Sequence, residues 1–125
     1  MGSRTYNLFL NDDGTVGIGT NVTDGYQLAV KGNVICEELK VKLFANWPDY
    51  VLNNDYKLLS LKEVENYIDK NQHLPGLPSA KEVSENGVNI GQINEALVKK
   101  VEELTKYIIE QQKQIDELKK KVANL

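Results

Sequence analysis

The chain has 125 residues, of which 41% are hydrophobic and 26% are charged, and this length allows one domain or two small modules. Residues 1–89 hold 8 basic and 12 acidic side chains (-4), and residues 90–125 hold 7 and 6 (+1). Neither part has the one-sided basic surface of a nucleic-acid-binding protein, so no nucleic-acid partner is predicted.

Composition also limits the chemistry that the chain can carry. One Cys and one His cannot form an intrachain disulfide or a zinc site within one chain. Cys36 is expected to be a small apolar strand residue, and His73 to belong to a Pro-rich turn, rather than to form a nucleophile and base pair. Phosphate loops, nucleophile elbows and metal motifs are missing from the sequence. We therefore predict no catalytic, cofactor or metal site and no enzymatic activity.

No apolar stretch approaches the roughly 20 residues of a membrane helix, so membrane insertion is not predicted. Met1-Gly2-Ser3 is typical of an expression start, and we expect the chain to be the C-terminal part of a longer protein.

Residues 1–45 are predicted to form short strands separated by turns. Apolar side chains alternate near the N-terminus, and Asn11-Asp12-Asp13-Gly14 is typical of a turn. The expected strands lie within residues 5–10, 15–20, 26–30 and 34–44. Gly17 and Gly19 weaken a strand unless backbone must approach closely, so we expect another chain to pack against them.

Residues 46–88 are predicted to form a small α-rich module. The pattern Ser60-Leu61-Lys62-Glu63 predicts a capping box and a helix start, and Ser79-Ala80-Lys81-Glu82 repeats it. The first helix should end before the segment His73–Pro78, and the second at Asn86-Gly87. The aromatic residues of the module allow two interpretations, a small core or a sugar-stacking platform with Trp47 and Tyr50 as candidates for glycan binding.

Residues 89–125 are predicted to form one long helix with a coiled-coil heptad pattern. Val or Ile recurs every seven residues at position a, and Leu dominates position d. These positions, which we call the heptad seam, are Ile90, Asn94, Leu97, Val101, Leu104, Ile108, Gln111, Ile115, Leu118, Val122 and Leu125. The chain offers no second long helix to cover the seam, so we predict a homo-oligomer. The alternative is that the helix folds back onto its own module.

The heptads alone leave dimer and trimer open. Ile or Val at a with Leu at d favours two parallel helices, as does Asn94 at an a position. The flanking e and g positions favour three, because none is acidic and several tolerate burial. Those flanking residues are Val98, Lys100, Thr105, Tyr107, Gln112, Gln114, Lys119 and Lys121.

Residues 14–20 read Gly-Thr-Val-Gly-Ile-Gly-Thr, and residues 28–34 read Leu-Ala-Val-Lys-Gly-Asn-Val. These two segments resemble the shaft repeat of phage tail fibres and related bacterial fibre proteins. The stretch from Trp47 through Ser79, the stretch Gly87–Gly91 and the terminal coiled coil resemble the C-terminal module that follows such shafts.

The resemblance implies an α+β fold with an intertwined trimeric β shaft, a small helical module and a C-terminal parallel coiled coil. It also implies a homotrimer in a virion tail fibre or an extracellular bacterial surface fibre, where the module sets the register of the shaft. A receptor- or glycan-binding tip for host attachment is the alternative function. A self-cleaving intramolecular chaperone is a third, but the Ser-Asp pair of that domain is missing, and Ser60 and Ser79 are expected to cap helices.

Overall fold

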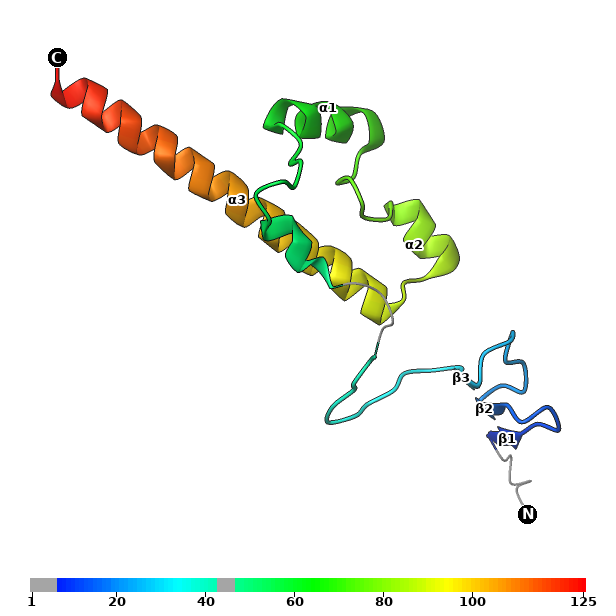
Figure 1. Cartoon of the computed structure of the whole chain (residues 1–125). Coiled ribbons are helices and arrows are strands. Elements are labelled where there is room, and N and C mark those ends of the chain that lie inside the picture. The colour runs from blue at the N-terminus through cyan, green and yellow to red at the C-terminus, as the bar shows by residue number, and fades with distance from the viewer. Residues whose placement is uncertain (1–6, 43–46) are drawn as a thin grey trace. The chain divides into compact units, whose positions relative to one another are not determined.

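The computed structural model describes residues 7–42 and 47–125, and the chain is α+β (Figure 1). It divides into two compact units, residues 1–40 and residues 41–125. The expected strand residues Thr5, Tyr6, Leu43 and Phe44 lie outside the described residues.

The first unit is a three-stranded sheet of very short strands. β1 (Leu8–Leu10) pairs antiparallel with β2 (Val16–Ile18), and β3 (Leu28–Val30) pairs parallel with β2. The turn between β1 and β2 closes with a hydrogen bond from the Gly14 amide to the Asn11 carbonyl oxygen, 3.0 Å. Three of the four predicted strands are thus confirmed, and they pair within one chain.

The interior of this sheet unit is polar. Thr15 and Thr23 are 7% and 8% exposed, and the Thr23 hydroxyl donates to the Thr15 hydroxyl, 3.3 Å. Thr15 also donates to the Asp13 carboxylate, 2.7 Å, and accepts from the Asn11 amide, 2.9 Å. The hydrogen bonds that Thr15 donates to the Asp13 carboxylate lower the pKa of Asp13, and the bond from the hydroxyl contributes most. Because each buried hydroxyl has partners, the unit does not pay the desolvation penalty of an unpaired polar group.

The predicted strand over Val34–Phe44 is wrong for residues 34–42, which have no regular secondary structure. A strand exists only where a neighbouring segment accepts and donates its ladder hydrogen bonds. Among the described residues, no segment pairs with this stretch, and Val34 and Ile35 are exposed.

Contacts within this chain by themselves require Gly17 and Gly19, and the packing of another chain against them stays a prediction. A Cβ atom on Gly17 would overlap the carbonyl oxygen of Thr20, and Gly19 has φ +74, which favours glycine. Both residues are therefore required by the fold of a single chain.

The second unit contains a 3-10 turn and three helices: η1 (Pro48–Leu52), α1 (Leu61–Asn71), α2 (Ala80–Asn86) and α3 (Ile90–Ala123). Both predicted capping boxes are present: Ser60 accepts from the Glu63 amide, 3.2 Å, and Ser79 from the Glu82 amide, 3.2 Å. α1 ends at a left-handed Gln72, and α2 at Gly87 with φ 67, as predicted.

Packing in the second unit is concentrated between η1 and α3. Pro48 and Val51 of η1 are fully buried against the surrounding chain, whereas α1, α2 and α3 bury no residue completely. Among the described elements, α1 and α2 pack against no other helix. The core of this unit therefore sits under η1, on one side of α3.

Candidate functional site

The heptad seam lies along α3 and is free of contacts that would bury it. All of its apolar members are large hydrophobic side chains left exposed, from 45% at Ile115 to 66% at Val122 within the helix. Leu125 follows the helix end and is fully exposed, and Asn94 and Gln111 are exposed as well. An exposed apolar stripe of this length is typical of a surface that another protein covers.

The back of α3 is the face that the chain covers for itself. The side chains that meet η1 and the following segment come from Lys99, Glu102, Glu103 and Lys106. They occupy positions b, c and f, which lie opposite a and d on a helix that advances 100° per residue. The helix thus does fold back onto its own module, but by the face that leaves the heptad seam open.

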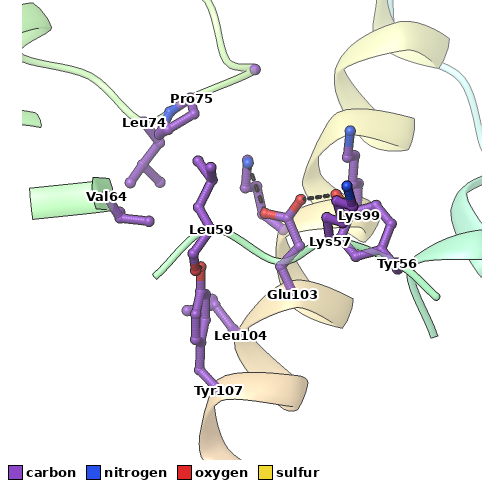
Figure 2. A pocket seen from close by; sticks show the side chains of 12 residues that line it. Tyr56, Lys57, Leu59, Val64, Leu74, Pro75, Lys99, Glu103, Leu104 and Tyr107 are labelled. Carbon is purple, nitrogen blue, oxygen red and sulfur yellow. Dashed lines mark hydrogen bonds and ion pairs between the residues drawn. The ribbon is translucent and has the colours of Figure 1, made fainter. Parts of the chain in front are cut away.

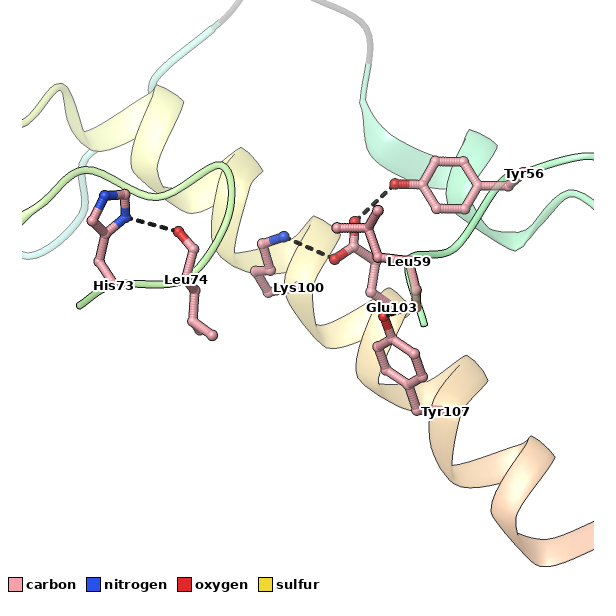
Figure 3. A network of polar contacts seen from close by, with 7 residues as sticks. All are labelled: Tyr56, Leu59, His73, Leu74, Lys100, Glu103 and Tyr107. Carbon is pink, nitrogen blue, oxygen red and sulfur yellow. Dashed lines mark hydrogen bonds and ion pairs between the residues drawn. The ribbon is translucent and has the colours of Figure 1, made fainter. Parts of the chain in front are cut away.

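A largely buried ion pair within α3 accepts a hydrogen bond from the segment after η1 (Figure 3). Glu103 accepts from Lys100 Nζ, 2.8 Å, and from the Tyr56 hydroxyl, 2.8 Å. The Lys100 and Glu103 side chains are only 16% and 13% exposed. Burial by itself raises the pKa of Glu103, but the bonds from Lys100 and Tyr56 outweigh it and lower that pKa. Burial and the Glu103 carboxylate raise the pKa of Tyr56 to about 12.

Lys106 ties α3 to the end of η1. Its Nζ donates to the carbonyl oxygens of Val51, 3.0 Å, and Asn53, 3.1 Å, and lies 5.5 Å from the centre of the Tyr56 ring. A cation at the C-terminal end of a helical turn satisfies carbonyl groups that lack partners within the turn. The sequence gives no warning of this contact, because 55 residues separate Val51 from Lys106.

A pair of carboxyl groups between α3 and η1 was also not predicted. Glu102 of α3 approaches Asp49 of η1, and its pKa is raised, first by burial and then by the Asp49 charge and a hydrogen bond to it. One carboxyl oxygen of Glu102 is buried with no hydrogen-bond partner among the described residues. The two carboxyl groups therefore weaken the contact between η1 and α3 once both are ionised.

A groove of about 230 Å³ runs beside the heptad seam on the flank opposite Val98 and Thr105 (Figure 2). Its apolar walls come from three parts of the unit: the segment before α1, α1 itself, and the segment after α1. The residues that form these walls and the floor are Leu59, Val64, Leu74, Pro75, Leu104 and Tyr107. Leu104 belongs to both the groove and the heptad seam.

The two candidate glycan-binding residues lie at the surface. Trp47 is 54% exposed and Tyr50 is 42% exposed, so the favoured interpretation of the aromatic residues as a core is wrong for these two. The Tyr50 ring lies 6.0 Å from that of Tyr56 in a tilted arrangement, and Lys99 Nζ lies 5.7 Å from its centre. Tyr56 and Tyr67 are half-buried.

The residues considered for catalysis have structural contacts. Ser60 and Ser79 are occupied as helix caps. His73 meets the Tyr67 ring edge-on at 5.6 Å, and its Nδ1 lies 3.0 Å from the Leu74 carbonyl oxygen (Figure 3). Cys36 is exposed in the irregular segment after β3.

Over residues 7–42 and 47–125, no group of three or more His, Cys, Asp or Glu side chains is arranged to hold a metal ion. Within the same ranges, none of the helices has the length and apolar character needed to cross a membrane. Comparison of the chain with protein-family models, with curated proteins and with solved structures finds no match.

Proposed function

We propose that this chain is a structural oligomerisation module: three copies associate in parallel through the heptad seam and cap a fibre whose β segments they hold in register. The observation that carries the proposal is the division of α3 into two faces. One face is packed by η1 of the same chain, and the opposite face is a continuous apolar stripe left exposed.

The exposed surface supports association. Burying the nine apolar seam side chains, each about half exposed, contributes on the order of 10 kcal/mol per chain. Forming a trimer takes two association steps at a cost of about 4–15 kcal/mol each. Three seams together match or exceed that cost.

The choice of three copies rests on the flanks of the seam. Position e carries Val98, Thr105 and Gln112, which tolerate burial, and no acidic e or g residue is present to form the interhelical salt bridges that align a dimer. Asn94 and Gln111 place polar groups on the axis, where they set register if they hydrogen-bond between chains.

The sheet unit also presents apolar side chains for neighbours to cover. Leu8, Leu10, Ile18 and Leu28 are exposed although they lie in strands. Three copies gathered by the coiled coil would bury these side chains along one axis as an interleaved β shaft. Together with the sequence resemblance, this favours a virion tail fibre or a bacterial surface fibre as the setting.

The test is the double variant Ile108→Asp with Ile115→Asp. We expect light scattering to give the mass of one chain, where the unmodified protein gives three, and circular dichroism to show loss of helix. The matched control is Lys113→Asp with Lys120→Asp, which places the same carboxylates at f positions and should leave the trimer intact. A trimer with unchanged circular dichroism in the seam variant would refute the proposal.

A receptor- or glycan-binding tip is the second candidate, favoured by the exposure of Trp47 and Tyr50 on η1. An aromatic ring that is more than half exposed is available for stacking on a sugar ring. Trp47→Ala should then abolish binding on a glycan array while the trimer persists. Leu52→Ala is the control, because Leu52 is equally exposed on the same turn. Absence of any glycan or cell-surface binding by the unmodified trimer would eliminate this candidate.

A further inference from the structure

The two flanks of the heptad seam are not alike. On the g flank, Lys100 and Tyr107 face the module: Lys100 bonds to Glu103, and the Tyr107 hydroxyl donates to the Leu59 carbonyl oxygen. On the e flank, Thr105 is exposed and bonds only to Val101 of its own helix, 2.8 Å. Beside it at position b, Ile109 is 51% exposed, so the packing of position b against η1 at Glu102 does not extend to Ile109.

The g flank carries the groove, and the residues that the structure describes leave its walls partly exposed. Leu59 is 45% exposed and Leu74 is 41% exposed, while their side chains and Val64 gather around one space above Leu104 (Figure 2). Val64 is the residue through which α1 reaches the groove, and α1 packs against no other described helix. Whatever fills the groove would therefore also hold α1 in place.

Parallel coiled coils bring the g flank of one helix against the e flank of the next. We propose that the groove is a docking site for a second copy of this chain, closed by the e flank of the neighbouring α3 with its Thr105 and Ile109. This inference rests on the proposed parallel assembly, and it assigns a contact that the seam by itself does not require.

Continuity with the seam supports this occupant. Leu104 lines the seam and the groove, so a helix seated on the seam of one chain reaches the edge of that chain's groove. The groove is also lined by Lys57, Lys99 and Lys100 against one carboxylate, Glu103. Thr105, Ile109 and Gln112 of the neighbouring chain are uncharged and add no further positive charge.

The contact is directional, since the groove of one chain receives the flank of the next. Such heterologous contacts close into a ring when the repeated rotation returns to the first copy, as a three-fold rotation does. Each module is then held between two helices of the assembly, which accounts for the lack of intrachain packing around α1.

Two singly labelled chains test the inference, both made in a Cys36→Ser background. One carries Leu74→Cys in the groove and the other Thr105→Cys on the e flank. The chains are unfolded, mixed, refolded and treated with a short bis-maleimide. We expect at least a ten-fold higher yield of the mixed covalent pair than with Lys113→Cys replacing Thr105→Cys, because Lys113 lies at an f position.

The outcomes separate this inference from the proposed function. If light scattering shows a trimer but the crosslink yield does not exceed that of the Lys113→Cys control, the groove contact is wrong and the proposed trimeric module still stands. A monomer overturns both. If Leu74→Cys fails to fold, Leu59→Cys reports on the same groove.

Hydrogen exchange supplies an independent measurement. In the trimer, Ile109→Glu should speed the exchange of the α1 amides at least ten-fold, while Lys113→Glu leaves them unchanged. Equal exchange rates in the two variants would also overturn the contact.

Discussion

The sheet unit and the helical unit bury different chemistry. In the sheet unit the buried side chains are Thr15 and Thr23, linked to each other and to Asn11 and Asp13 by hydrogen bonds. In the helical unit the fully buried residues are Pro48 and Val51, which both belong to η1. The first unit is specified by backbone geometry and local hydroxyl bonds, whereas the second depends on apolar surface that its own chain covers only on one side of α3.

This difference indicates which unit a single chain can complete without other copies. The close approach that requires Gly17 and the bonds of Thr15 lie within a single sheet unit. The seam and the groove of the helical unit, in contrast, stay open until other copies arrive. Variants that affect one unit and spare the other follow, from the largest expected effect to the smallest.

Gly17→Ala should destabilise the sheet unit most, by about 3 kcal/mol or more, because the added Cβ meets the Thr20 carbonyl oxygen and backbone must move. We expect loss of the β amide signals in nuclear magnetic resonance spectra while light scattering still reports the oligomer. Gly25→Ala is the control: its Cβ meets nothing within 4 Å, and only φ +84 opposes it, at about 1 kcal/mol. Loss of the oligomer in Gly17→Ala would show that the two units fold together.

Glu103→Gln should destabilise the helical unit by about 2 kcal/mol at pH 7, because Lys100 is left largely buried without its carboxylate. Unfolding in urea, followed by the fluorescence of the single Trp beside η1, measures the effect. Glu110→Gln, on an exposed part of the same helix, should change little.

The difference in stability between the unmodified protein and Glu103→Gln should depend on pH, with a definite sign. The pKa of Glu103 in the folded unit lies below its ordinary value of 4.5, so its stabilisation is present above pH 4.5 and is lost as the pH falls through the lowered pKa. The unmodified protein and Glu103→Gln should therefore converge in stability as the pH falls below 4.5 and through the lowered pKa of Glu103. A constant difference across this range would contradict the assigned role of the ion pair.

Thr15→Val should cost the sheet unit about 1.5 kcal/mol, because the shape is kept while Asn11, Asp13 and Thr23 lose a partner. The pKa of Asp13 should rise towards its ordinary value in the variant, which a carboxyl titration by nuclear magnetic resonance can follow. Thr20→Val, whose hydroxyl bonds an exposed amide, is the matched control.

Ser60→Ala should have the smallest effect, about 1 kcal/mol, and it should be confined to α1. Because α1 packs against no other described helix, its first turn depends strongly on the capping box. Hydrogen exchange of the Val64 amide should accelerate in Ser60→Ala, whereas Ser79→Ala should affect only α2. Acceleration across α3 in Ser60→Ala would instead mean that α1 supports the long helix.

The sequence predicted features that depend on neighbours along the chain. Both capping boxes, the end of α1 before His73 and the glycine end of α2 depend on residues within about six positions of each other, and all were found where expected. The expected strand over residues 34–42 failed for the opposite reason, since a strand needs a partner that local sequence does not supply.

The candidate site shows the same limit. The heptad positions could be assigned from their spacing. Their exposure is compatible with the predicted oligomer, which stays a proposal. The contacts of Lys106 with Val51, and of Glu102 with Asp49, could not be foreseen, because they join residues about 50 positions apart.

For this protein the sequence by itself determined the helix starts and ends, the tight turns and the continuous apolar stripe, because each follows from residue chemistry at short, regular spacing. Only the tertiary structure decided which face of α3 its own module covers, where the groove opens and why Gly17 must lack a side chain. Those features arise where segments distant in sequence meet, and no local pattern encodes which segments will do so.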